Sequence, residues 1–209
     1  MSVAAASGGR DLSNAQTLPY KALWGAGIVI VVVSLVSLTF SLVTPLKAFA
    51  GQKLLAVSWE KTLATGEPQV PWPWADFKMG ARLSFPRVGR ALFTLDQASG
   101  EAMAWGPGEV VGTAPLGSPG LAAVAGHRDS HFRFLEQIQE GDVVLVELPD
   151  GSSQSYEIKR GDVVDSREWE IPQITYGPSS ILLVTCWPFG GNTSGPLRFL
   201  WYAEKLIEA

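Results

Sequence analysis

Three residues in the second half of the sequence have side chains suited to covalent catalysis by a thiol. Cys186 is the only cysteine among 209 residues, His127 lies 59 positions before it, and Arg198 lies 12 positions after it. A thiolate is a strong nucleophile, an imidazole transfers protons near neutral pH, and a guanidinium stabilises a developing oxyanion. We therefore predict Cys186 as the nucleophile, His127 as the general acid/base and Arg198 as the oxyanion-stabilising group.

A lone cysteine has a second interpretation, because cysteine is among the residue types most often buried. Cys186 follows the apolar run 181–184 (ILLV), which is consistent with an inert core thiol. A single cysteine in a disulfide-permissive compartment is buried, paired between chains or chemically used. The following segment 187–191 (WPFGG) must end the strand, so Cys186 is expected at a strand end, where a side chain can face a cleft. This position favours chemical use.

The two histidines differ in their settings. His127 follows a predicted strand and Gly126, so it too is expected at a strand end, although a hydrogen-bonded loop histidine is the alternative. His131 opens a predicted helix, which favours a structural role. Asp129 is placed to orient His127 or the adjacent loop. One cysteine and two histidines without a close cluster do not make a zinc site, and no acidic group indicates calcium, so we expect no metal and no cofactor.

Short β-runs separated by turns must position these residues. Strands are predicted over 81–88, 91–96, 121–125, 142–148, 153–160, 181–187 and 197–203. The turn 149–151 (PDG) joins two of them as a hairpin, and 131–138 has apolar residues at helical spacing. Seven or more short strands with one or two small helices indicate an all-β fold, a closed or nearly closed barrel.

The N-terminal region differs in composition from the rest. Residues 22–44 carry no charge over 23 positions, which is long enough for a helix to cross a ~30 Å hydrocarbon core. We therefore predict a short cytoplasmic tail over 1–21, a transmembrane signal anchor over 22–44, a juxtamembrane helix and Pro/Trp-rich linker over 45–78, and a catalytic barrel over 79–209. A signal peptide cleaved near 48–50 (AFA) is the alternative, but its apolar core would usually be only ~7–15 residues long.

Two further features of composition bear on partners. Within the linker, Trp72 and Trp74 suit either packing on the barrel or the membrane interface, and we predict packing on the barrel. A short helix is predicted over 53–63. The formal net charge of −4 gives no reason to expect a nucleic acid partner.

The residues around the three candidates resemble the sortase family. The stretch 182–186 (LLVTC) departs from the family's Thr-Leu-x-Thr-Cys strand end only at its first residue. The stretch 125–127 (AGH) is similar to the family's histidine motif, and 196–199 (PLRF) lies at the place of its arginine. Finer features, including 71–75 (PWPWA) and 186–189 (CWPF), resemble the proteobacterial branch.

This resemblance covers roughly residues 79–209 and implies a closed eight-stranded sortase-type β-barrel preceded by an N-terminal transmembrane helix. It implies a single-pass protein of the bacterial inner membrane whose barrel faces the periplasm. The implied partner is a target protein with a C-terminal LPXTG-like sorting signal, and the accepting amine is not specified by any motif.

The resemblance also implies a mechanism. Cys186 would attack the carbonyl of the Thr-Gly bond, Arg198 would stabilise the oxyanion, and His127 would protonate the leaving amine. An amine would then resolve the thioester, with ping-pong kinetics. Thr185 is assigned to the pocket floor, and Gly126 is the glycine that precedes the family's histidine.

Other classes share parts of this pattern. Cell-wall L,D-transpeptidases also use His, Cys and Arg in a β-rich fold, but their nucleophile turn is Ser-x-Gly-Cys-like, whereas 183–187 here reads LVTCW. NlpC/P60-type peptidases place cysteine before histidine, the reverse of the order here. From a different class, a membrane-tethered β-barrel binding module without catalysis would bury Cys186 and protect it from thiol reagents.

Overall fold

The computed structural model describes residues 20–191 and 195–207. The chain divides into two compact units, Met1–Lys47 and Ala48–Ala209, which are described separately below. The described residues form one long α-helix, three short 3₁₀ helices and eight strands: α1 (Tyr20–Thr65), β1 (Met79–Phe85), η1 (Pro86–Val88), β2 (Arg90–Leu95), η2 (Ala102–Ala104), β3 (Gly108–Glu109), β4 (Gly120–Ala125), η3 (Arg133–Gln137), β5 (Val143–Glu147), β6 (Ser153–Asp165), β7 (Ser179–Cys186) and β8 (Leu197–Lys205).

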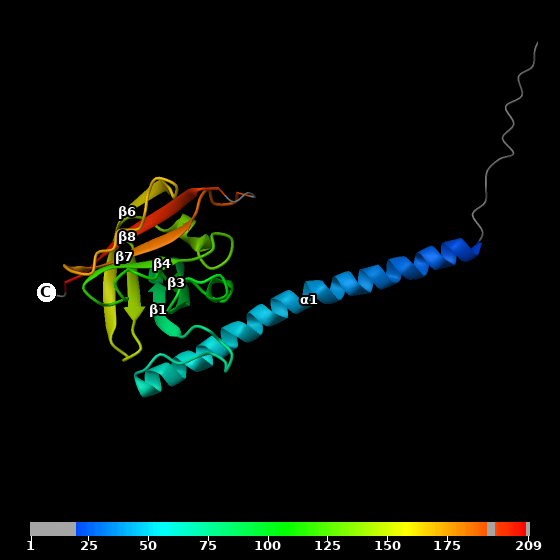
Figure 1. The fold of residues 1–209 in the computed structure, drawn as a ribbon, viewed down its shortest axis with the longest axis horizontal. Helices are drawn as coiled ribbons and strands as arrows, with labels where there is room; N and C mark the ends of the chain where they lie inside the picture. Colours follow the sequence, from blue (N-terminus) through cyan, green and yellow to red (C-terminus); the bar gives the residue numbers. More distant parts are fainter. Residues whose placement is uncertain (1–19, 192–194, 208–209) are drawn as a thin grey trace, which may run out of the picture. The chain divides into compact units, whose positions relative to one another are not determined.

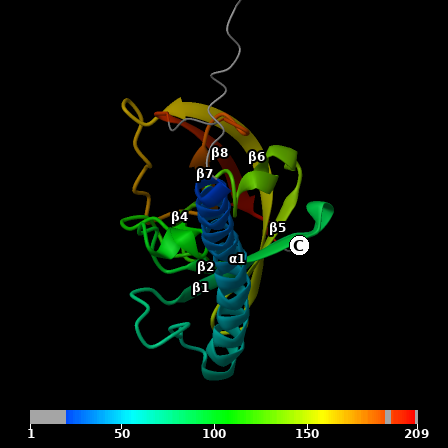
Figure 2. The same ribbon diagram turned by 90° about the vertical axis from the view of Figure 1, so that its right-hand side faces the viewer.

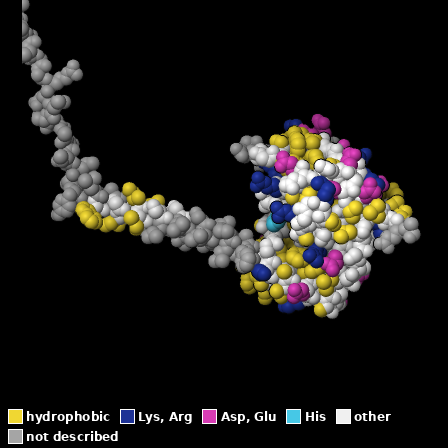
Figure 3. Space-filling model, turned by 180° about the vertical axis from the view of Figure 1, so that it is seen from behind, with side chains coloured by type: hydrophobic (Ala, Val, Ile, Leu, Met, Phe, Trp, Pro, Cys, Tyr) yellow, Lys and Arg dark blue, Asp and Glu magenta, His cyan; other side chains and the backbone are white. Residues whose placement is uncertain are grey.

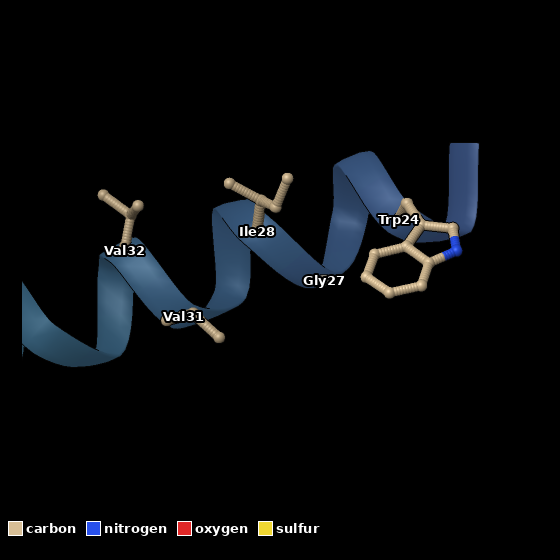
Figure 4. A pocket seen from close by; sticks show the side chains of 5 residues that line it. All are labelled: Trp24, Gly27, Ile28, Val31 and Val32. Carbon is tan, nitrogen blue, oxygen red and sulfur yellow. The ribbon is translucent and has the colours of Figure 1, made fainter. Parts of the chain in front are cut away.

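In the first unit, helix α1 exposes large apolar side chains. Trp24, Ile28, Val31 and Val32 project from the helix (Figure 4). Each of these side chains is more than half exposed. Among the residues that the structure describes, no helix is both long and apolar enough to cross a membrane. Residues 1–19 of the predicted tail and many side chains of the predicted span 22–44 lie outside the described residues.

In the second unit, the eight described strands close into a barrel in the order β1-β2-β3-β4-β7-β8-β6-β5 (Figure 1, Figure 2). Neighbouring strands are antiparallel except for two parallel pairs, β2–β3 and β4–β7. The prediction of a closed, eight-stranded, mainly β fold is therefore confirmed. The parallel pair β4–β7 matters most for function, because it aligns two strands that end at the same rim.

The barrel interior is filled by alternate residues of the strands. On β1 and β7, every second side chain points inward, and the inward set includes Leu83, Phe85, Ile181 and Leu183. Residues at i and i+2 of a strand share a face, so the intervening residues of β7 must point outward. Outward-facing Leu182 and Val184 are also buried, because a second apolar cluster covers them.

The C-terminal part of helix α1 packs on the barrel through a separate apolar cluster. Leu55 and Trp59 are buried against residues that include Trp72 and Phe77, and the Trp59 indole donates a hydrogen bond to Glu147 at 3.3 Å. The short helix predicted over 53–63 is thus the end of a longer helix.

The two linker tryptophans behave differently. Trp72 packs in this cluster, with its ring edge-on to Phe77 and Trp105, as predicted. The same prediction is wrong for Trp74, which is 79% exposed. Trp74 lies in the turn between the helix and β1, so only one of the two closely spaced rings reaches the barrel.

Several element bounds also differ from the predictions. The strand predicted over 153–160 continues to Asp165, because residues 161–165 pair with β8 up to Leu197. The helix predicted over 131–138 is the shorter 3₁₀ helix η3. The hairpin turn at Asp150 is confirmed, since the Asp150 carboxylate accepts hydrogen bonds from the backbone and hydroxyl of Ser152.

Strand β3 introduces a carboxyl group into a poorly solvated position. Glu109 accepts a hydrogen bond from the backbone N–H of Leu116 at 3.1 Å, which holds the turn between β3 and β4. The pKa of Glu109 is raised to about 7, mainly by burial; the Leu116 hydrogen bond opposes the rise, and the charge of Asp96 adds a smaller part to it. Between pH ~4.5 and ~7, the folded protein therefore holds a proton that the unfolded chain has released.

Replacing Glu109 with glutamine should weaken the pH dependence of stability. Because the folded-state pKa is raised, the free energy of unfolding of the wild type should fall as pH rises from about 4.5 to 7, by up to about 3 kcal/mol. The variant mimics the protonated acid and should lack this loss, so it should be more stable than wild type at pH 8. Urea unfolding at pH 5, 6, 7 and 8 measures this, with Glu101→Gln as an exposed control. Parallel pH profiles for wild type and Glu109→Gln would refute the assignment.

Candidate active site

Strands β7 and β8 place the cysteine and the arginine directly opposite each other. Cys186 is the last residue of β7, Arg198 is the second residue of β8, and the two are register partners in the antiparallel pair. Directly opposed residues have Cβ atoms about 4.5–5.5 Å apart and point to the same face. Both side chains are partly exposed, so this corner of the barrel is open to a substrate.

The parallel pairing of β4 with β7 brings His127 to the same rim. The last register pair is Ala125 with Val184, and the N–H of Gly126 then donates to the carbonyl of Val184 at 3.1 Å. His127 is the next residue and is exposed. Continuing the register by two positions sets His127 level with Cys186. All three predicted residues therefore lie on the ends of adjacent strands.

Thr185 fastens these two strand ends together. Its hydroxyl donates to the carbonyl of Gly126 at 2.7 Å, and its side chain is 2% exposed. Because it alternates with Cys186, Thr185 points to the inward side of β7. Thr185 thus braces the strands that carry Cys186 and His127, and its predicted part in the pocket floor stays a prediction.

The glycine before His127 is required by close packing. A Cβ atom at Gly126 would lie 2.9 Å from the ring of Phe132 and 3.1 Å from Pro107. The chain then turns sharply, and the N–H of Phe132 donates to the carbonyl of His127 at 2.9 Å. This turn fixes the backbone of His127.

Arg128 connects the loops on both sides of the site, a role that the sequence reading missed. Its guanidinium donates to the carbonyl of Pro188 at 3.1 Å and to the carbonyl of Gly191 at 2.5 Å. Pro188 follows Cys186 by two residues, whereas Arg128 directly follows His127. A Cβ atom at Gly191 would lie 3.3 Å from the guanidinium, so glycine permits this approach.

Only one nitrogen of the Arg198 guanidinium donates hydrogen bonds to other described residues. Its Nη1 donates to the carbonyls of Gly195 and Leu197 at 2.7 and 2.9 Å, which holds the side chain in place. Within the described part of the chain, its Nε and Nη2 groups have no hydrogen-bond partner. These donors are available to an anion that forms at the rim.

Asp165 provides a nearby negative charge. A hydrogen bond from Arg167 is the main cause that lowers the pKa of Asp165 to about 2, and the charge of Arg198 contributes a smaller part. Asp165 therefore stays ionised at any physiological pH and keeps a negative charge near Arg198.

The remaining polar residues of the His127 loop have other roles. Asp129 is exposed and makes no hydrogen bond to His127 in the described structure. Burial lowers the pKa of His131, the hydrogen bond that its ring donates to the backbone carbonyl of Ala104 opposes this, and the charges of His127 and Asp129 act with opposite signs. His131 thus lies within electrostatic range of His127. No cluster of His, Cys, Asp or Glu among the described residues could hold a metal ion.

An apolar strip on the outer face of the barrel leads to the cysteine. Leu182 and Val184 lie on the same face as Cys186, beside Leu121, Ala123 and Leu200 of the neighbouring strands. The loop between β6 and β7 covers this strip with Trp169 and Ile171. A cavity of about 390 Å³ opens between the loop and the strip.

Together, the fold and this rim define a closed β-barrel with a Cys, His and Arg group at the ends of three adjacent strands. The Sortase domain family matches residues 83–206, more than half of the chain. This chain therefore belongs to the Sortase domain family.

Individual proteins similar to this chain are also sortases. Sortase D of Bacillus subtilis (strain 168) is 24% identical over 124 residues, which cover 59% of this chain and 62% of the relative. Sortase A from Corynebacterium diphtheriae superposes with a TM-score of 0.56 at 22% identity, covering 65% and 64% of the two chains. Sortase C-1 from Actinomyces oris gives 0.53 at 25% identity, covering 61% and 72%. The matched region spans less than two thirds of the length of sortase D.

Proposed function

We propose that this protein is a membrane-anchored cysteine transpeptidase that cleaves an LPXTG-like sorting signal between Thr and Gly and transfers the acyl group to an amine. The observation that carries the proposal is the strand register, which sets Arg198 opposite Cys186 and brings His127 to the same rim. Membership of the sortase family, whose members act as transpeptidases on sorting signals, supports the same activity.

In the proposed mechanism, Cys186, His127 and Arg198 act together to form a thioester and then to resolve it. The sulfur of Cys186 attacks the threonine carbonyl carbon, and the resulting oxyanion accepts hydrogen bonds from the unused donors of Arg198. His127 gives a proton to the glycine nitrogen as the C–N bond breaks, which leaves a thioester. An amine then attacks the thioester, His127 takes its proton, and the thiolate leaves.

The apolar strip provides a seat for the sorting signal. Leucine and proline of an LPXTG-like signal are apolar, and the strip formed by Leu182, Val184 and their neighbours ends at Cys186. Trp169 of the covering loop would contact the bound peptide. Because burying an apolar side chain contributes about 1.5–3 kcal/mol, this strip supplies affinity without any charged contact.

We further propose an N-terminal anchor in the bacterial inner membrane, with the barrel in the periplasm, and membership of the proteobacterial branch. The support is the uncharged stretch 22–44 and the motifs 71–75 and 186–189. If the anchor is correct, the full chain should stay in the membrane fraction after washing at alkaline pH. Release by that wash would refute the anchor.

The activity is tested with a fluorogenic peptide that contains an LPXTG sequence, a scrambled peptide as control, and the full chain in detergent. Mass spectrometry should find cleavage between Thr and Gly, and an added amine should yield the Thr–amide product. An unchanged peptide would overturn the proposed activity. A thiol that resists labelling in the folded protein would favour the binding-module alternative.

Replacing Arg128 with glutamine should slow turnover without unfolding the barrel. Glutamine cannot reach both loop carbonyls, so the loop after Cys186 should move relative to His127, and kcat should fall about 10-fold or more with little change in KM. Hydrogen exchange of amides 189–191 should accelerate in parallel. The exposed Lys78→Gln substitution serves as control. Unchanged kcat together with unchanged exchange would remove Arg128 from the positioning role.

A further inference from the structure

A polar pocket of about 540 Å³ lies beside the His127 loop. Its lining includes Arg90 of β2, Ser130 and His131 of the loop, Arg133 and Glu136 of η3, and Gln52 of helix α1. Gln52 belongs to the same compact unit as the barrel, so all the described lining residues lie within one unit. The apolar cavity under the β6–β7 loop shares no lining residue with this pocket.

The pocket adjoins the proposed general acid/base. Ser130 and His131 lie in the turn that the hydrogen bond from Phe132 to His127 closes. The charge of His127 also acts on His131, which places the two imidazoles within electrostatic range. A molecule held in the pocket would therefore have its free end close to His127.

The charges of the pocket favour an anion. The side chains of Arg90 and Arg133 make no hydrogen bond or ion pair to any other described residue, and both are exposed to solvent. Among the described lining residues Glu136 is the only acidic one, so together with Arg90 and Arg133 they carry a net positive charge. In Figure 3, a histidine side chain lies at the surface next to Lys or Arg side chains. Guanidinium groups bind carboxylates and phosphates with paired hydrogen bonds.

We propose that this pocket binds the acceptor substrate, an amine that also carries an anionic group, carboxylate or phosphate. The assignment rests on the proposed transpeptidase function. Arg90 and Arg133 hold the anionic group while the amine nitrogen reaches the thioester carbonyl at Cys186. The C–N bond forms, the C–S bond breaks, the proton of the amine passes to His127, and the thiolate keeps the electron pair.

The separation of the two cavities explains how both substrates can bind. The sorting signal occupies the apolar strip on β4, β7 and β8, whereas the acceptor approaches from the side of β2 and η3. The acyl-enzyme can thus keep its peptide in place while the amine enters. Amines and water compete to attack the thioester, and the charged side chains of the acceptor pocket favour those amines that carry an anionic group.

The test compares three matched acceptors: glycylglycine, its neutral amide and its aminomethylphosphonate analogue. Wild type and Arg90→Gln/Arg133→Gln are assayed as full chains with an LPXTG peptide, and transfer product is separated from hydrolysis product. The wild type should use at least one anionic acceptor with a KM about 5-fold or more below that of the amide. The anionic acceptor with the lower KM shows whether the pocket recognises a carboxylate or a phosphate group.

In the double variant this preference should disappear, while peptide hydrolysis without acceptor and use of the neutral amide stay within about twofold of wild type. Lys61→Gln/Lys78→Gln, which removes the same charge elsewhere on exposed positions, should keep the preference. Peptide cleavage with equal use of all three acceptors, or a preference that survives in the double variant, overturns the acceptor assignment alone. No peptide cleavage at all overturns the proposed function and the assignment with it.

Discussion

Replacing Cys186 with alanine should abolish both cleavage of a sorting-signal peptide and formation of a thioester. The thiol is the only cysteine sulfur in the chain, so no second residue can form a thioester. We expect turnover to fall by at least about 10⁴-fold, to the level of the uncatalysed reaction. Steady-state hydrolysis of a fluorogenic LPXTG peptide measures this loss.

The fold should survive this change. Cys186 is partly exposed at the end of β7, and surface substitutions of this kind usually change stability by less than about 1 kcal/mol. Circular dichroism and thermal unfolding provide the check. Cys186→Ser is the matched control for shape, and it should be nearly as inactive because a serine hydroxyl is rarely ionised near neutral pH. Turnover by Cys186→Ala close to wild type would rule out covalent catalysis by this thiol.

Replacing Arg198 with lysine should cause the second largest loss. Lysine keeps the positive charge but lacks the planar fork that lets one part of the group bind Gly195 and Leu197 while the rest faces the rim. Removal of one oxyanion donor typically lowers kcat by about 10²–10³-fold, and we expect a loss of this size. KM for the peptide should change little, because the contact strengthens mainly in the transition state.

Arg167→Lys is the control for this experiment. Arg167 lies nearby and binds Asp165, but it is exposed and has no proposed contact with the substrate. It should therefore retain near-normal kcat. If Arg198→Lys also turns over near-normally, Arg198 does not stabilise the oxyanion, and backbone N–H groups must do so instead.

The fold class could be predicted because most strands carry their own local signal. The apolar run before Cys186 and the Pro-Asp-Gly turn after β5 can be recognised from the sequence without knowledge of tertiary contacts. Strand β3, by contrast, has only the two residues Gly108 and Glu109, and a two-residue strand has no periodicity to read. The second half of β6 was missed because pairing with β8, not local composition, keeps it extended.

The strand ends that carry the candidate residues could be predicted from the sequence, but the contacts that support them could not. Two strand ends and a following arginine can be recognised along the chain, and spacing limits how they pair. Arg128 was missed because it binds the backbone carbonyls of Pro188 and Gly191, and carbonyls are present whatever the residue type. The hydrogen bond from Thr185 to the carbonyl of Gly126 could not be predicted either, because it depends on which face of β7 Thr185 occupies.

The central claim, that Cys186 forms a thioester with a sorting signal, is tested most directly by the mass of the intact protein. The full chain is mixed with an LPXTG peptide, quenched in acid and measured, and a digest locates the adduct. We predict an added mass equal to the peptide fragment up to threonine, attached to Cys186 and released by hydroxylamine. A peptide that is cleaved without any adduct on Cys186, or with an adduct elsewhere, would contradict the account.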